Sequence, residues 1–366
     1  MEKRPYLSIV MNSRNDNYQG ASFKRLQLAV SNLIEQAKRY NLNAELIIVD
    51  WNPPADKPLL KDVVSLPNDL GPLSVKFIVV PPSIHKKYNA SAKINIVIPA
   101  AYNVGIRRAK GEFIMPTNSD VLFSEELMHF LSLEKLEKNQ FYRAIRYEIP
   151  RETLNSSPLK EQMELWKTII PKLNLKNQLS PHGLSNHPTL LTFCGADFLV
   201  FPSENWRLLH GYPEINHIGL AADELMCYMA YMSGLKEEVL KSPMQVYHID
   251  HDSRWHTLGQ SRLYRFLNDK IFHKLDENNK LRACARKIYR TKASISRFFM
   301  NFYFNIFIKY IEKHTSPEKL DFDIKYIGWR YQKVLKEMLK GKRPCAYSND
   351  DWGFPKENFK EFIFSS

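Results

Sequence analysis

Short apolar runs alternate with longer segments of helical spacing along the first part of the chain. Residues 6–11, 44–49 and 73–80 are apolar runs that predict strands, and residues 23–40 carry apolar side chains at the spacing of a helix. The run 44–49 is almost continuously apolar, which is typical of a parallel strand covered on both faces. A strand, a helix and a second strand in this order predict a doubly wound α/β sheet.

The stretch 102–123 continues this pattern. Residues 102–109 have helical spacing, and the basic residues Arg107, Arg108 and Lys110 lie near the helix end, where they suit the helix dipole. Gly111 stands where a left-handed residue would end the helix. Residues 112–115 predict a short buried strand. Pro116 should end that strand, because proline cannot donate a hydrogen bond to a central ladder.

Thr117-Asn118-Ser119-Asp120 follows directly and should lie beyond the carboxyl end of this strand. Open α/β sheets bind their ligands at that edge. The apolar residues 121–123 anchor Asp120 from the other side. A carboxylate fixed in this way suits a divalent cation that carries phosphates, since Mg²⁺ and Mn²⁺ favour oxygen ligands. The alternative is an ordinary turn residue.

The second half of the chain predicts two further places for polar chemistry. One is a helix that begins with two acidic residues, and the other is a strand that ends at a segment with two histidines. Residues 141–149 predict a strand that carries Arg143 and Arg146 among apolar side chains. Asp223-Glu224 opens a predicted helix over 225–234, where two carboxylates also suit the helix dipole. Residues 238–247 predict a strand that leads into His248-Ile249-Asp250-His251-Asp252.

Composition narrows the class of protein. The hydrophobic fraction of 44% and the charged fraction of 25% are ordinary for a soluble globular protein. The four cysteines are far apart and form no CxxC pair. They predict reduced thiols in a cytosolic protein rather than a zinc site or a disulfide framework. No apolar run is long enough for a signal-peptide core or a membrane-spanning helix.

Positive charge is concentrated in the last third of the chain. The net charge is +13, and residues 256–366 contain 23 Lys and Arg against 12 Asp and Glu. Such a region suits nucleic acid, an anionic membrane surface or a lipid-diphosphate acceptor. Spacing predicts helices here, and residues 298–311 are apolar over most of the helix circumference. That helix either packs on protein or rests on a membrane surface. The tail 348–354 is too patterned for a disordered end and predicts a segment that folds back near the site.

The motifs around the central stretch resemble a known enzyme family. Asn103-x-Gly105, Ala109-x-Gly111-Glu112-Phe113-Ile114 and the polar triplet ending in Asp120 resemble family-2 glycosyltransferases of the GT-A fold. The resemblance implies an α/β, Rossmann-like catalytic domain over 1–255, with a mostly parallel mixed sheet flanked by helices. A basic α-helical region over 256–366 would follow it.

The resemblance also implies an activity. It implies transfer of a sugar from a nucleotide-diphosphate sugar to a hydroxyl of a glycan or lipid-linked acceptor, as a hexosyltransferase that inverts the sugar's configuration. Many such enzymes build cell-surface polysaccharide or lipopolysaccharide. The expected location is cytoplasmic, with peripheral membrane contact through the basic region and no nucleic acid as partner.

Roles on the donor side follow from the same resemblance. The family's DxD motif holds the metal and the diphosphate. Asn118-Ser119-Asp120 stands in its place, so Asp120 would bind Mn²⁺ or Mg²⁺ and Asn118 would contact the donor. Ser13, Arg14 and Asp50 would line the nucleotide pocket, although Asp50 could instead cap a helix or turn. His248 or His251 would complete the metal shell.

Roles on the acceptor side follow in the same way. Gly195-Ala196-Asp197 and Gly211-Tyr212-Pro213-Glu214 resemble the segments that lead to the family's acidic motif. That motif is Asp223-Glu224 here. One of the two carboxylates would be the general base that takes the proton of the acceptor hydroxyl, and Asp223 is preferred.

Two other classes of protein compete with this interpretation. A nucleotidyltransferase on a similar sheet usually has a glycine-rich phosphate loop after the first strand, and Met11-Asn12-Ser13-Arg14 lacks those glycines. A non-enzymatic nucleic-acid binder would explain the basic region. That region has no recognisable binding motif, and its aromatic residues do not interleave with its basic ones.

Overall fold

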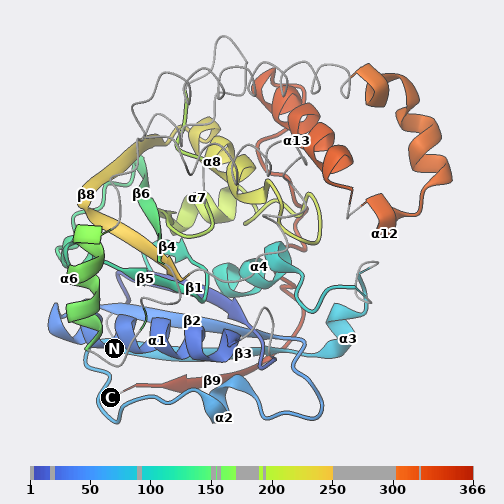
Figure 1. Ribbon diagram of the computed structural model, residues 1–366. Coiled ribbons are helices and arrows are strands. Elements are labelled where there is room, and N and C mark those ends of the chain that lie inside the picture. The colour runs from blue at the N-terminus through green and yellow to red at the C-terminus, as the bar shows by residue number, and fades with distance from the viewer. Residues whose placement is uncertain are drawn as a thin grey trace. The chain divides into compact units, whose positions relative to one another are not determined.

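A computed structural model of the chain describes residues 4–16, 21–88, 93–149, 154, 158–169, 189–192, 195–249, 302–320 and 323–365. The chain divides into two compact units (Figure 1). The first comprises Met1–His251 together with Leu335–Ser366, and the second comprises Asp252–Val334. The sequence had assigned 256–366 to one helical region, whereas its last part belongs to the first unit because it supplies a strand to the sheet.

A nine-stranded sheet forms the framework of the first unit, in the order β5-β8-β6-β7-β4-β1-β2-β3-β9. Apolar side chains fill both faces of its central strands, and every residue of β2 is buried. The strands are β1 (Leu7–Ser13), β2 (Ala44–Trp51), β3 (Leu73–Val80), β4 (Phe113–Pro116), β5 (Val121–Phe123), β6 (Gln140–Ile149), β7 (Leu199–Pro202), β8 (Lys236–Ile249) and β9 (Lys360–Phe364).

Parallel and antiparallel neighbours both occur in this sheet. β3, β2, β1 and β4 are parallel neighbours, and β6 is parallel to β8. β7 joins β4 and β6 in antiparallel orientation, as β5 joins β8 and β9 joins β3. The predicted α/β class and the mixed sheet flanked by helices are confirmed, with antiparallel pairings as common as parallel ones.

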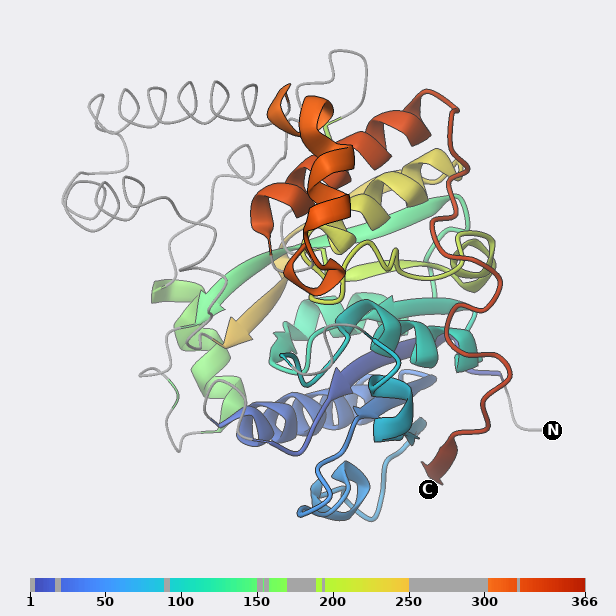
Figure 2. The ribbon, with the colours of Figure 1, turned by 90° about the vertical axis from the view of Figure 1, so that its right-hand side faces the viewer.

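Helices cover the two faces of the parallel strands (Figures 1 and 2). Ile9 and Met11 of β1 share a core with the apolar side of α1, whereas Val10 faces α4. Alternate residues of a strand point to opposite faces, so α1 and α4 lie on opposite sides of the sheet. The helices of this unit are α1 (Ser22–Arg39), α2 (Leu60–Val63), α3 (Pro82–His85), α4 (Ile98–Arg108), α5 (Glu125–Ser132), α6 (Leu159–Ile169), α7 (Ser203–Leu208) and α8 (Ala222–Met232).

Two glycines of the central stretch allow close packing at the sheet. A Cβ on Gly105 would lie 2.4 Å from Cγ1 of Val10, so α4 can approach β1 only without that atom. A Cβ on Gly111 would lie 2.5 Å from the backbone nitrogen of Ser8. The prediction that Gly111 ends the helix in a left-handed conformation is wrong, because its φ is not positive and α4 ends at an extended Ala109. Gly111 is required by the contact with β1 instead.

Most of the predicted elements are confirmed, with bounds that differ by a few residues. Ser124 caps α5, since its Oγ accepts the N–H of Leu127. The sequence between 83 and 100 has no clear period and would suggest a loop, but it contains part of α3 and the beginning of α4.

The second unit is helical where the structure describes it. A helix over 302–314 is followed by α12 (Pro317–Leu320) and by α13 (Ile324–Leu339), which continues into the first unit. Phe304, Tyr326 and Trp329 form a small apolar cluster between the 302–314 helix and α13. None of the helices described here is long and apolar enough to cross a membrane.

Candidate functional site

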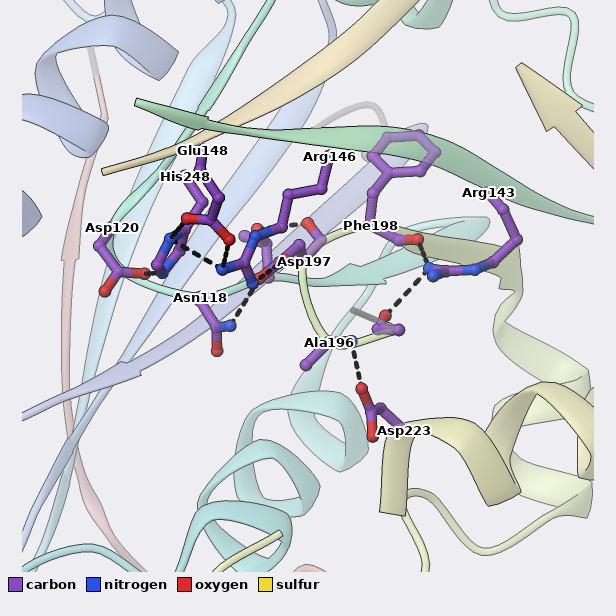
Figure 3. A network of polar contacts seen from close by, with 12 residues as sticks. Asn118, Asp120, Arg143, Arg146, Glu148, Ala196, Asp197, Phe198, Asp223 and His248 are labelled. Atoms are coloured by element: carbon purple, nitrogen blue, oxygen red, sulfur yellow. Dashed lines mark hydrogen bonds and ion pairs between the residues drawn. The ribbon is translucent and has the colours of Figure 1, made fainter. Parts of the chain in front are cut away.

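Asp120 lies just beyond the carboxyl end of β4, as the sequence predicted, and two basic side chains face it. Because β5 runs antiparallel to β8 with Val121 opposite His248, the histidine lies next to Asp120. Nε2 of His248 is 3.6 Å from Oδ1 of Asp120 (Figure 3). Nε of Arg25, on α1, is 3.8 Å from Oδ2 of the same carboxylate. Each oxygen of the Asp120 carboxylate therefore faces a basic side chain, and of the two Arg25 carries a permanent charge.

Glu148 orients the His248 ring. β6 and β8 pair with Glu148 beside His248, and Oε2 of Glu148 is 2.8 Å from Nδ1 of the ring. In the tautomer with a proton on Nδ1, this nitrogen donates to Glu148 and Nε2 is directed at Asp120. Nη2 of Arg146 lies 2.9 Å from the same Nδ1. Burial lowers the pKa of His248, but the Glu148 hydrogen bond and the Asp120 charge raise it above its usual value. Burial raises the pKa of Glu148, but His248 and Arg146 lower it to about 2.

The chemistry of this pair fits a divalent cation. One carboxylate oxygen and one imidazole nitrogen converge, and the other ring nitrogen is held by a carboxylate, as is usual for histidine ligands. In the described part of the chain, no group of three His, Cys, Asp or Glu side chains could hold a metal. Diphosphate oxygens and water would supply the other ligands, which suits Mg²⁺ in particular. His251 lies outside the described residues.

Arg146 connects this pair with the turn 195–197. Its guanidinium contacts the Glu148 carboxylate, and its Nη1 donates to Oδ2 of Asp197 over 2.7 Å. The Asp197 side chain is only 1% exposed, so this ion pair is largely removed from water. Arg143, on the same strand, is fully buried and donates to the backbone carbonyls of Leu191, Gly195 and Phe198. The two arginines of β6 therefore fix the turn from its side chain and from its backbone.

Asn118 is held from both sides in the position of the first acidic residue of a DxD motif. Its Nδ2 donates to Oδ1 of Asp197 over 2.6 Å. Its Oδ1 accepts from the hydroxyl of Tyr102, on α4, over 2.7 Å. The neighbouring Thr117 hydroxyl donates to the Asp197 carbonyl over 2.8 Å. An amide can make both contacts because it donates and accepts at once, whereas an ionised carboxylate only accepts.

Asp223 stands in the first turn of α8, on the other side of the turn 195–197 (Figure 3). Its Oδ2 accepts the N–H of Ala196 over 3.4 Å. A Cβ on Gly195 would lie 2.9 Å from Cβ of Asp223, so this glycine allows the approach. Burial, followed by the charge of Glu224, raises the pKa of Asp223 to about 6. A half-buried carboxylate with this pKa can take a proton near neutral pH.

Glu224 differs from Asp223 in what it contacts. Its Oε1 accepts from the hydroxyl of Thr192 over 3.2 Å. The contact directs Glu224 toward the segment 189–192, whereas Asp223 contacts the turn that carries Asp197.

The other predicted nucleotide-site residues lie at the carboxyl ends of β1 and β2. Ser13 is buried opposite Asp50 in the β1–β2 register. Arg14 donates to the Asn52 carbonyl over 2.5 Å and to Oδ2 of Asp16 over 2.6 Å. These groups form a polar cluster that borders the two strand ends.

Asp50 is fully buried. It caps a helix, which was the alternative to nucleotide binding that the sequence left open. Its Oδ2 accepts the N–H of Leu60, the first residue of α2, over 2.9 Å. Burial raises its pKa to about 6. A part in nucleotide binding stays a prediction for this residue.

Four site residues were not identified as such from the sequence. Arg146, Glu148, Asp197 and Tyr102 all belong to the polar network around Asn118 and Asp120. Arg146 gave a usable signal, because an arginine within an apolar strand needs a buried partner. Nothing in the local sequence of Glu148 indicates that it lies beside His248, since that pairing comes from the sheet register.

Comparisons with known proteins give only distant likenesses. No family model matches the sequence, and no curated protein matches it. A structure of residues 1–349 of S. aureus TarS in complex with UDP-GlcNAc is similar, with a TM-score of 0.46 and 13% identity, over 92% of each chain. The same S. aureus segment in complex with UDP gives a TM-score of 0.44 and 14% identity, over 92% of this chain and 91% of that one. A longer S. aureus TarS structure gives 0.44 and 15%, over 93% of this chain and 54% of that chain. At these values the function has to be argued from the site itself.

Proposed function

We propose that the protein is a glycosyltransferase that moves a sugar from a nucleotide-diphosphate sugar to a hydroxyl acceptor. The observation that carries the proposal is the pairing of two unlike carboxylates across one polar network. Asp120 is flanked by Arg25 and His248, and Asp223 has a raised pKa and lies at the other side of the turn 195–197. Transfer to a hydroxyl needs both an anchor for the diphosphate and a base for the acceptor proton.

On the donor side, Asp120 and Nε2 of His248 would hold Mn²⁺ or Mg²⁺. A bound cation supplies positive charge to the diphosphate leaving group. Glu148 keeps the imidazole oriented, and Arg146 holds Glu148 and the turn in one arrangement. Asn118 and the polar cluster at Ser13 and Arg14 would contact the donor, as the resemblance to family-2 glycosyltransferases implies.

On the acceptor side, Asp223 is the proposed general base. It accepts the hydroxyl proton as the acceptor oxygen forms a bond to the anomeric carbon and the bond from that carbon to the diphosphate oxygen breaks. The electron pair of the broken bond leaves with the nucleoside diphosphate. A single displacement of this kind inverts the configuration of the transferred sugar. Glu224 raises the pKa of Asp223 through its charge, which makes the neighbouring carboxylate a better base.

A panel of nucleotide sugars tests the proposal directly. We expect one of the UDP-, GDP-, CMP- or dTDP-sugars to raise the melting temperature, more strongly with Mn²⁺ or Mg²⁺ than without. The same donor should release its nucleotide when a hydroxyl acceptor is supplied. If no member of the panel shifts the melting temperature in either condition, the protein does not have this function.

The proposed setting is the cytoplasmic face of a membrane, in the synthesis of cell-surface polysaccharide or lipopolysaccharide. In the second unit, one side of the 302–314 helix packs on Tyr326 and Trp329 through Phe304. Another side carries exposed apolar residues, with Phe302 59%, Ile306 55% and Tyr310 65% exposed. These three are spaced four apart, so they form one stripe. An exposed aromatic stripe in the basic part of the chain suits peripheral contact with an anionic surface or a lipid-linked acceptor.

A further inference from the structure

The C-terminal tail forms one wall of an open cavity that the proposed reaction does not use. We call it the tail cavity. Its volume is about 230 Å³. Tyr88 and Glu214 form the wall on the body side, and residues 347–349 and 351–354 form the wall on the tail side. The sequence singled out 348–354 as a patterned segment, and this cavity is where that pattern converges.

Two arginines of α4 fix the tail wall in place. Nη1 of Arg107 donates to the carbonyls of Asp350 and Trp352, over 3.1 and 2.9 Å. Arg108 donates to the carbonyls of Gly353, Phe354 and Glu357, over 2.7 to 2.9 Å. The Arg107 guanidinium also lies 4.8 Å from the ring centre of Trp352. Both arginines stand in the last turn of α4, where the sequence predicted that they suit the helix dipole, and their side chains also hold the tail.

Backbone geometry at Gly353 confirms how closely the tail is seated. Its φ is +65°, and a Cβ there would lie 2.4 Å from the carbonyl oxygen of Asn103 on α4. Only glycine meets both conditions, so the tail is fitted to α4 at this point. The wall of the cavity is therefore a built part of the first unit.

Glu214 is held in the opposite wall. Its Oε1 accepts from Nδ2 of Asn103 over 3.0 Å, and its Oε2 is 3.5 Å from the hydroxyl of Tyr88. Asn103 follows Tyr102, whose hydroxyl holds Asn118 in the candidate site. One helix, α4, thus connects the tail cavity with the donor side of the site.

The lining determines which ligands fit. It contains the carboxylates of Glu214 and Asp351 and the rings of Tyr88, Tyr347 and Phe354. None of the described residues that line it is a Lys or Arg, although Nζ of Lys356 lies 3.5 Å from Oδ1 of Asp351 at the rim. In a chain with a net charge of +13, such a lining disfavours phosphates and other anions. Carboxylates accept hydrogen bonds from hydroxyls, and aromatic rings pack against the C–H faces of a sugar.

We propose that the tail cavity binds one neutral sugar ring of the acceptor, away from the hydroxyl that reacts. The inference rests on the proposed function, because the sugar can be part of an acceptor only if the protein is a glycosyltransferase. The binding itself can be measured without any turnover, so the two can fail separately.

Saturation-transfer NMR on the full chain tests the proposal, with methyl glycosides of glucose, galactose and N-acetylglucosamine as probes. We expect millimolar binding of at least one glycoside that persists when the best nucleotide of the donor panel is present in excess. Glu214→Gln and Asp351→Asn should each weaken it by about fivefold, the effect of losing one hydrogen bond. Asp351 lies at the rim with its side chain 68% exposed, so its replacement should leave the fold intact.

Asp350→Asn is the matched control. It makes the same change of charge one residue away, on a side chain that is 99% exposed and does not line the cavity. Binding should be unchanged in this variant. Loss of the glycoside signal on addition of nucleotide would place the sugar in the donor pocket and overturn the proposal. So would equal binding by wild type and both lining variants, or no glycoside binding at all. Binding of tetramethylammonium in place of every glycoside would identify a cation site instead and would equally overturn it.

Discussion

The two carboxylates at the ends of the polar network are built for opposite tasks. Asp120 has His248 on one oxygen and Arg25 on the other, so its negative charge is compensated. Asp223 accepts a long hydrogen bond from the N–H of Ala196. Burial, followed by the charge of Glu224, works against its ionisation more strongly than the charge of Arg143 favours it. A compensated carboxylate stays ionised and can hold a ligand. An uncompensated one has a pKa near neutrality and can exchange a proton.

Removing the Asp120 carboxylate should have the largest effect on sugar transfer. We expect Asp120→Ala to abolish transfer and to weaken binding of the nucleotide sugar in the presence of Mn²⁺, because the donor loses its anchor. The melting temperature should change by only a few degrees. Calorimetric titration of the donor, together with a transfer assay, measures both. Wild-type activity in this variant would remove Asp120 from the site.

Removing the Asp223 carboxylate should lower the rate of transfer and leave donor binding intact. Asp223→Asn keeps the shape of the side chain and removes the proton acceptor, so kcat should fall by about 10²–10⁴-fold with donor affinity little changed. The folded pKa of Asp223 is raised, so its ionised form opposes folding at neutral pH. The variant should therefore melt at a higher temperature than wild type at pH 7.

Glu224→Gln is the matched variant for this prediction. If it alone shows the loss of kcat, the base is one residue further along. If neither variant loses kcat, the inverting mechanism is wrong.

The network between the two ends should matter for stability. Arg146→Gln leaves Asp197, only 1% exposed, without its cation, which costs about 3 kcal/mol of the free energy of unfolding. Arg39→Gln is the control, since Arg39 also contacts two carboxylates, Glu35 and Glu125, but on the surface. That change should cost less than about 1 kcal/mol. Urea unfolding measures both, and equal losses would show that the Arg146 pairs contribute no more than surface pairs.

The pH dependence of kcat tests the role of Asp223 as a base in the wild-type protein. Asp223 must be deprotonated to act as a base, and its pKa is about 6. The value of kcat should therefore fall about tenfold per unit at pH values well below 6. Glu148, with a pKa of about 2, stays ionised over this range. Asp223→Asn should lose the inflection near pH 6; an inflection that persists belongs to another group.

The sequence predicts the positions of the two carboxylates but not their surroundings, because the surrounding residues come from distant parts of the chain. Asp120 was identified because it follows a strand, and Asp223 because it begins a helix. Both elements can be recognised from the apolar pattern of a short stretch of sequence. The residues that set their different environments come from elsewhere in the chain, as Arg25 on α1 and Glu148 on β6 show. Their partners are fixed by strand order and register, which a single sequence does not encode locally. The tail is a similar case, since its place beside β3 and α4 follows from contacts between residues that are 245 or more positions apart.

The smallest expected effect concerns a second comparison, between the first unit and the basic helical unit. We expect the full chain to bind anionic vesicles through the second unit, because each Lys or Arg near such a surface contributes up to about 1 kcal/mol. Screening over a Debye length of about 8 Å at physiological salt should make this binding fade as salt is added. Replacing Phe302, Ile306 and Tyr310 with Ser removes the exposed stripe, and these side chains are more than half exposed, so the change should leave the fold intact. Vesicle co-sedimentation should then fall severalfold, whereas neutral vesicles should bind neither protein. If the variant melts at a much lower temperature instead, the stripe is part of a packed interface and the basic charge serves another partner.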